Sequence, residues 1–147
     1  FNYRITDIQC ALGVSQLKKL ARFIKRRQAI AGRYLEAFRD LKGLDLPTVR
    51  EGVEPGWHLF QVRVPEADLR RPLYDRLQSL GLGVQVHYLP VYRHPYYASL
   101  GYREGLCPVA EDLYARSVTL PLFPRMTDDD VSSVIHRVRL AVSEILT

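Results

Sequence analysis

The residues best suited to chemistry gather in one stretch, His87 to Tyr97, with the sequence HYLPVYRHPYY. Five of the nine tyrosines lie between Tyr88 and Tyr102, and two of the four histidines, His87 and His94, lie in the stretch from His87 to Tyr97. Because tyrosine combines an apolar ring with a polar hydroxyl, such a cluster is suited to covering a sugar or a nucleotide base. The stretch follows a predicted strand, where loops commonly carry binding groups. It indicates a ligand site, although a proline- and tyrosine-rich loop that only packs against its own domain fits the residue types equally well.

Metal, nucleophile and phosphate-loop chemistry have no matching pattern in the sequence. His87 and His94 lie seven residues apart with no cysteine nearby, which is not a zinc spacing. Neither a glycine-rich phosphate loop nor a nucleophile elbow occurs. The three consecutive aspartates at 128–130 are explained by the first turn of a helix that begins after Thr127. We therefore predict no metal site and no catalytic residue in this chain.

The first predicted element is a helix over Thr6–Leu41, which begins with a T-x-x-Q capping box and has apolar residues at 3.6-residue spacing. Such a helix would be about 50 Å long, which is long for a domain of 147 residues. We expect a bend at Gly13 or Gly32, or a helix that links this domain to another one. Gly43 is the predicted stop.

The remaining elements must position the tyrosine-rich stretch. They are a strand over 57–64, a helix over 69–80, a strand over 83–87, a loop over 88–105, a helix opened by Pro108, a strand over 117–120 and a helix begun by Thr127. This order of helices and few strands predicts an α+β domain with helices on a small sheet. We expect residues 1–43 to form an interdomain helix and residues 44–147 a small C-terminal domain.

The charge of the chain favours anionic ligands without choosing among them. Net charge is +5, with 17 arginines and four lysines. Seven cations share one face of the first predicted helix, opposite its apolar residues: Lys18, Lys19, Arg22, Lys25, Arg26, Arg33 and Arg39. A nucleic-acid site would interleave aromatic residues with these cations, so we interpret this face as solvated and nucleic-acid binding as unlikely. With no membrane-spanning run and no signal peptide, we expect a cytoplasmic protein.

Segments in order along nearly the whole chain resemble one enzyme family. They are FNYRITDIQCALG at the start, LKKL, WHLF, GLGVQVHYLPV, PYY, LGY, LPLFP and MTD. They are similar to the sugar-nucleotide aminotransferases of the DegT/DnrJ/EryC1/StrS family, which use pyridoxal 5'-phosphate and have the aspartate aminotransferase fold (fold type I). The form VHYLPVY-x-x-PYY is most similar to the branch that aminates a UDP-linked 4-keto sugar on the route to pseudaminic acid.

The resemblance implies a dimeric enzyme more than twice as long as this chain. In the family, a large N-terminal domain carries the Schiff-base lysine, the aspartate that pairs with the pyridine nitrogen and the aromatic residue stacked on the ring. All of these would precede Phe1, and since the only methionine is Met126, we expect a piece of a longer chain. The parent would transfer an amino group from glutamate to a UDP-linked 4-keto-6-deoxy sugar. This fragment, without the lysine, would be inactive.

Six residues carry over from the family pattern. Asn2 matches the asparagine that reaches the cofactor phosphate of the other subunit, and Arg4 beside it would serve that phosphate or the nucleotide diphosphate. His87 and Tyr88 match a strand-end pair near the sugar-nucleotide site, with Tyr96 and Tyr97 as wall residues. Cys10 stands where alanine is usual. The opposing interpretations are a stand-alone, non-enzymatic module that binds a nucleotide sugar or a polyanion, and a truncated product with no role of its own.

Overall fold

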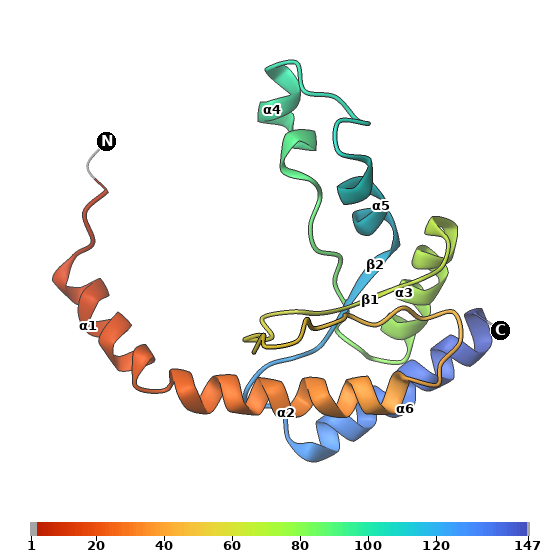
Figure 1. Cartoon of the computed structure of the whole chain (residues 1–147), viewed down its shortest axis with the longest axis horizontal. Helices are drawn as coiled ribbons and strands as arrows, with labels where there is room; N and C mark the ends of the chain where they lie inside the picture. Colours follow the sequence, from red (N-terminus) through yellow and green to blue (C-terminus); the bar gives the residue numbers. More distant parts are fainter. Residues whose placement is uncertain (1–2, 147) are drawn as a thin grey trace.

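A small antiparallel sheet lies at the centre of the fold in the computed structural model of the chain, which describes residues 3–146. Strand β1 (Phe60–Arg63) pairs along its whole length with strand β2 (Ser117–Leu120). Single bridges extend the sheet on both sides, from Asp45 to β1 and from Gln85 to β2. Helices surround this sheet (Figure 1), which confirms the predicted α+β class.

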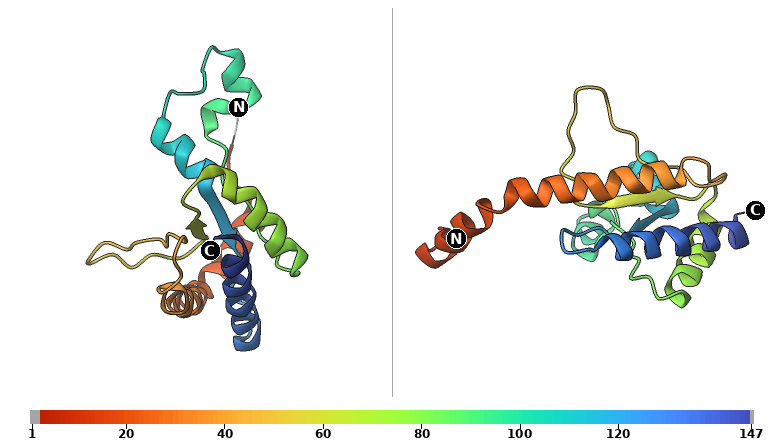
Figure 2. Two further views of the ribbon diagram at one scale, coloured as in Figure 1. Left: turned by 90° about the vertical axis from the view of Figure 1, so that its right-hand side faces the viewer. Right: turned by 90° about the horizontal axis from the view of Figure 1, so that it is seen from below.

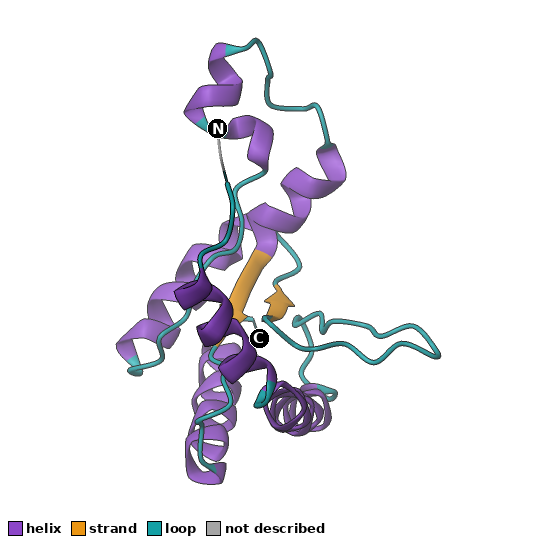
Figure 3. Ribbon diagram, turned by 90° about the vertical axis from the view of Figure 1, so that its left-hand side faces the viewer, coloured by secondary structure: helices purple, strands orange, loops and turns teal. Residues whose placement is uncertain are grey.

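The helices differ in how closely they contact the sheet. In chain order they are α1 (Asp7–Leu17), α2 (Leu20–Phe38), η1 (Ala67–Leu69), α3 (Arg70–Ser79), η2 (Val91–Arg93), α4 (Pro95–Ser99), α5 (Pro108–Arg116) and α6 (Asp128–Ile145). Helices α2, α3 and α6 lie beside the sheet (Figure 2), and each contributes side chains to the hydrophobic core. The loop between the Asp45 bridge and β1 projects from the sheet (Figure 3).

The two faces of the sheet differ in polarity because side chains alternate along each strand. One face is apolar and buried against the helices: Phe60, Val62, Val118 and Leu120. The other carries Gln61, Arg63, Ser117 and Thr119. Ser117 and Thr119 are each 5% exposed, so this second face holds buried hydroxyl groups that need hydrogen-bond partners.

The first predicted helix is interrupted, but not at a glycine. It divides into α1 and α2 at Lys18 and Lys19, where the Lys19 amide donates to the Gln16 carbonyl at 2.9 Å in a tightened turn. Gly13 and Gly32 stay helical, so the prediction that one of them bends the helix was wrong. The core does not extend across the break: α1 buries no side chain, whereas α2 buries Ile30, Ala31, Tyr34 and Phe38.

The strand predictions are only partly correct. Strand β2 has the predicted bounds, but the strand predicted over 57–64 pairs only as β1. The strand predicted over 83–87 makes one bridge, at Gln85, and on one side of it Pro121 has no N–H for a further ladder bond. Helix α2 ends at Phe38 rather than at Gly43, since the chain must turn earlier for Asp45 to bridge to Arg63.

The segment predicted as a loop over 88–105 contains η2 and α4. Pro95 opens α4 at a first-turn position, where its missing N–H costs no helical hydrogen bond. Pro108 opens α5 in the same way, as predicted. The helical turns that the prediction missed are short, and apolar periodicity cannot detect an element of three to five residues.

Helix α6 begins as predicted. The Thr127 hydroxyl accepts from the Asp130 amide, and the Asp130 carboxylate accepts from the Thr127 amide at 2.8 Å, which completes a capping box. Three ion pairs join α6 to α2 and the turn that follows α2: Arg26–Asp128 at 2.9 Å, Arg33–Asp128 at 3.2 Å and Arg139–Asp40 at 2.7 Å. The aspartates at 128–130 therefore cap and anchor a helix.

Candidate functional site

His87, a predicted substrate-binding residue, is held from two sides on the polar face of the sheet. Its ring Nδ1 lies 3.0 Å from Thr119 Oγ1, and Gln61 Nε2 donates to its backbone carbonyl at 2.6 Å. Gln61 and Thr119 are directly opposite each other in the β1–β2 ladder. One cross-strand pair therefore fixes both the ring and the main chain of His87. Sequence reasoning misses Gln61 and Thr119 because their pairing is long-range and no local motif signals it.

Tyr88 extends the site from His87 towards solvent. The peptide bond between the two residues is cis, their ring centroids are 4.5 Å apart, and Tyr88 is 65% exposed. Both residues line a hollow of about 500 Å³ on the polar face of the sheet, together with Arg63 and Tyr114. The Arg63 guanidinium lies 3.6 Å from the Asp45 carboxylate, so its charge is partly compensated.

Tyr96 and Tyr97 lie on α4, in the segment 88–107 that we call the tyrosine arm. The arm extends away from the sheet (Figure 1), and neither η2 nor α4 buries a side chain. Tyr97 forms edge-to-face contacts with Tyr96 at 5.3 Å and with Tyr102 at 6.1 Å between ring centroids. Tyr96 is 68% exposed and Tyr97 37% exposed. The arm therefore presents aromatic rings to solvent, unlike a loop packed on its own domain.

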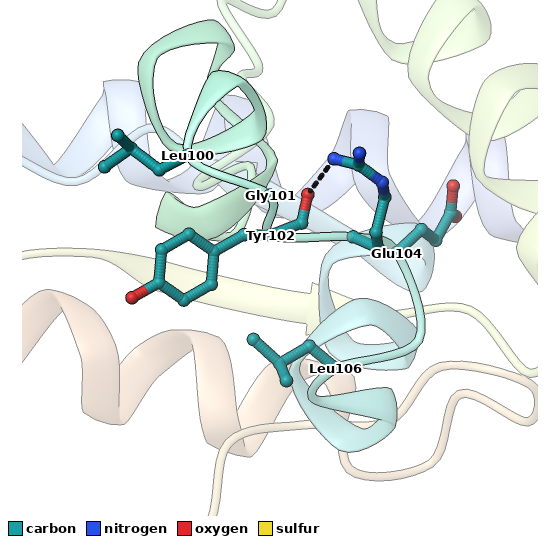
Figure 4. Close-up of a pocket in the computed structure, with 6 residues that line it drawn as sticks. Leu100, Gly101, Tyr102, Glu104 and Leu106 are labelled. Atoms are coloured by element: carbon teal, nitrogen blue, oxygen red, sulfur yellow. Dashed lines mark hydrogen bonds between the residues drawn. The ribbon is translucent and has the colours of Figure 1, made fainter.

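A second hollow, of about 590 Å³, lies within the outer part of the tyrosine arm. Leu100, Tyr102 and Leu106 extend to one side of the loop and Glu104 to the other (Figure 4). The Arg103 guanidinium donates to the Tyr102 carbonyl and to the Ala98 carbonyl, and so caps the end of α4. None of the predicted site residues lines this hollow.

Of the two residues predicted to reach the cofactor, the structure describes only Arg4. Asn2 lies outside the described residues. Arg4 is exposed in the segment before α1, which is well separated from the arm (Figure 1). Within residues 3–146, the structure therefore brings His87 and Tyr88 together, carries Tyr96 and Tyr97 on the same arm, and leaves Arg4 apart from both pairs.

The N-terminal segment exposes a series of apolar side chains. Those at least 45% exposed between residues 3 and 20 are Tyr3, Ile5, Ile8, Leu12, Val14, Leu17 and Leu20. The apolar face predicted for the first helix is thus buried only in the second half of α2. The free energy of hydration of this surface is unfavourable, and exposed apolar side chains in such a series are typical of a contact surface.

Some of the cations predicted to share one face of the first helix form ion pairs in the structure. Arg26 and Arg33 contact Asp128, and Arg39 contacts Glu36 at 3.1 Å. These contacts lower the net positive charge of this face, since Asp128 neutralises one of the two arginines that it contacts. Within residues 3–146, no group of three metal-ligating side chains occurs, and no helix is both long and apolar enough to cross a membrane.

Comparison with known proteins identifies the family. Residues 1–139 match the model of the DegT/DnrJ/EryC1/StrS aminotransferase family. The chain is 40% identical over 144 residues to the spore coat polysaccharide biosynthesis protein SpsC of Bacillus subtilis, covering 95% of this chain and 37% of SpsC.

Solved structures agree with the family match. The PLP form of the sugar aminotransferase Spr1654 from Streptococcus pneumoniae has a TM-score of 0.87 at 28% identity, over 98% of this chain and 37% of that one. PseC from Helicobacter pylori, an aminotransferase of pseudaminic acid biosynthesis, has a TM-score of 0.86 at 27% identity, over 98% of this chain and 39% of PseC. The chain therefore spans less than two-fifths of the length of these relatives, and it belongs to the DegT/DnrJ/EryC1/StrS aminotransferase family.

Proposed function

We propose that this chain is the C-terminal part of a pyridoxal-phosphate-dependent sugar-nucleotide aminotransferase. Its parent would transfer an amino group from glutamate to the 4-keto group of a UDP-linked 6-deoxy sugar, in the branch that leads to pseudaminic acid. The observation that carries the proposal is the fixed His87–Tyr88 pair at the base of an exposed tyrosine arm, in a chain of this family. Likeness to SpsC and PseC supports a sugar substrate.

The residues of the site suit the parts of a sugar nucleotide. Tyrosine rings offer apolar faces to the sugar or the base, and their hydroxyls donate hydrogen bonds to phosphate oxygens. The Nε2 of His87 remains for the ligand, since Nδ1 is engaged by Thr119. In this proposal His87 and Tyr88 bind the substrate, and Tyr96 and Tyr97 form a wall beside it.

The cofactor requires groups that this chain does not contain. Lys18, Lys25 and Lys42 are exposed and Lys19 is only half-buried, so none has the desolvated setting of a Schiff-base lysine. Pyridoxal phosphate supplies the electron sink for transamination when it is bound. We place its lysine in a large domain outside this chain, with Asn2 and Arg4 contributing to its phosphate across a homodimer in the cytoplasm. The chain by itself would be inactive.

A turnover assay tests this function. The enzyme that contains this chain would be incubated with pyridoxal phosphate, glutamate and a UDP-4-keto-6-deoxy-N-acetylhexose, and 2-oxoglutarate would be measured. We expect 2-oxoglutarate in proportion to amino sugar, and none from the 147-residue chain alone. The proposal fails if the longer enzyme produces neither. Tight binding of the UDP-sugar by the isolated chain, with no such enzyme encoded, would instead favour a stand-alone binding module.

A further inference from the structure

One carboxylate ties the two ends of the tyrosine arm together. Glu111, on α5, accepts a hydrogen bond from the Tyr92 hydroxyl at 2.5 Å near the start of the arm. At the other end, it accepts from the Gly105 amide, at 2.8 Å through Oε1 and 3.0 Å through Oε2. The Cys107 amide also donates to the Tyr92 hydroxyl at 3.3 Å. We call Tyr92, Glu111 and these two amides the clasp.

The clasp matters because the tyrosine ring contacts and the Arg103 hydrogen bonds lie within the outer part of the arm and do not tie it to α5. Its side chains at Tyr88, Tyr96 and Leu100 are 60% exposed or more, so hydrophobic burial contributes little to its conformation. The arm also contains the Arg93–Glu104 ion pair at 3.2 Å, but the Glu104 side chain is 69% exposed, so solvent screens the pair. A carboxylate that accepts several hydrogen bonds at once is the strongest tie between the arm and α5.

Protonation states at neutral pH agree with this geometry. The Tyr92 hydrogen bond, with help from the Gly105 amide, lowers the pKa of Glu111, so the carboxylate is charged and accepts. Desolvation, followed by the hydrogen bond to Glu111, raises the pKa of Tyr92 to about 12, so the phenol keeps its proton and donates. Donor and acceptor are thus both in the form that the clasp needs.

We propose that Glu111 and Tyr92 are positioning residues that hold the tyrosine arm in the conformation that binds the sugar nucleotide. Tyr96 and Tyr97 lie between the two tied ends, so their place relative to His87 depends on the closure of the loop from 92 to 105. In this proposal, Glu111 and Tyr92 act through the arm and not through contact with the substrate. The inference rests on the proposed function for the identity of the ligand, whereas the mechanical role of the clasp does not.

Three variants test the clasp in two measurements. Tyr92→Phe removes the phenol, Glu111→Ala removes the carboxylate, and Asp112→Ala is the control, since Asp112 contacts Arg116 on the same helix and not the arm. Amide hydrogen exchange would be followed for residues 94–106. Loss of a charge-assisted hydrogen bond should speed exchange there about tenfold in both clasp variants, with the rest of the chain unchanged.

The second measurement compares KM and kcat in the enzyme that contains this chain. We expect KM for the sugar nucleotide to rise about five- to tenfold in both clasp variants, with KM for the amino donor and kcat unchanged and with the control at wild-type values. Unchanged exchange in the arm would refute the clasp. Faster exchange with an unchanged KM would refute its role in substrate binding. If the unmodified enzyme does not turn over any sugar nucleotide, the proposed function falls, while the exchange data still decide whether the clasp holds the arm.

Discussion

Thr119→Val separates the role of His87 in binding from its role in the fold. The substitution removes the hydroxyl that lies 3.0 Å from His87 Nδ1 and leaves the backbone pairing of Thr119 with Gln61 and Gln85 intact. A neutral hydrogen bond of normal length contributes about 0.5–1.5 kcal/mol, so we expect the free energy of unfolding to fall by about 1 kcal/mol. The melting temperature should then fall by about 3–6 °C.

The same substitution releases the His87 ring, which then populates several rotamers. If the fixed orientation of the ring contributes about 1 kcal/mol to substrate binding, its loss should raise KM for the sugar nucleotide about fivefold in the enzyme that contains this chain. The ring nitrogens would be followed by NMR, where the Nδ1 resonance should shift. Thr127→Ala is the control, because it should cost a similar free energy of unfolding by breaking the α6 capping box, and Thr127 does not line the hollow that contains His87.

Two results would contradict this reasoning. If Thr127→Ala raises KM as much as Thr119→Val does, the effect is a general loss of stability and not a loss of His87 orientation. If Thr119→Val changes stability but neither the ring resonance nor KM, the hydrogen bond between Thr119 and His87 does not position the ring. The first result would leave the candidate site without support from His87, and the second would remove Thr119 from it.

Three further predictions concern the cofactor, the last helix and acid stability. Asn2→Ala in the enzyme that contains this chain should weaken retention of pyridoxal phosphate, measured by absorbance after dialysis, and unchanged affinity would remove that role. Thr127→Ala breaks the α6 capping box and should lower the free energy of unfolding by about 1 kcal/mol in urea titrations, whereas Thr127→Ser should not. The hydrogen bond from Arg139 lowers the pKa of Asp40 from 3.8 to about 2, so the stabilisation is complete above pH 4 and is lost as the pH falls towards 2. Asp40→Asn should therefore destabilise the chain at pH 6, and the difference from wild type should shrink as the pH falls from 4 through 2; a difference that stays constant over that range would contradict the assignment.

Local signals account for what the sequence predicts well. The capping boxes at Thr6 and Thr127 each depend on two residues three positions apart, and both form. Gly81 ends α3 with φ +78°, and the Leu82 amide donates to the Leu77 carbonyl as in a Schellman motif. In each case the residues that determine the feature lie within about one turn of helix. A short stretch of sequence is therefore enough to predict it.

Non-local pairing accounts for what the sequence does not predict. The break at Lys18 and Lys19 has no proline or glycine to signal it, and it lies where the helix leaves the core. The support of His87 by Gln61 and Thr119 joins three separate segments of chain. Motifs in the sequence predict which residues belong to the candidate site. The groups that orient His87 depend on strand register, which no local motif predicts.

The parallel packing of α2 on α6 has a consequence during synthesis of the protein. Arg26 and Asp128, which join the two helices, are 102 residues apart. A ribosome that adds about 5–20 residues per second leaves the apolar face of α2 without its partner for roughly 5–20 s. Tyr34 and Phe38 are fully buried in the finished fold, and although Phe60 can pack on Tyr34 earlier, their helix lacks α6 throughout that interval. The nascent chain therefore presents a binding segment for a chaperone at α2, and translation pauses before residue 128 should increase its aggregation.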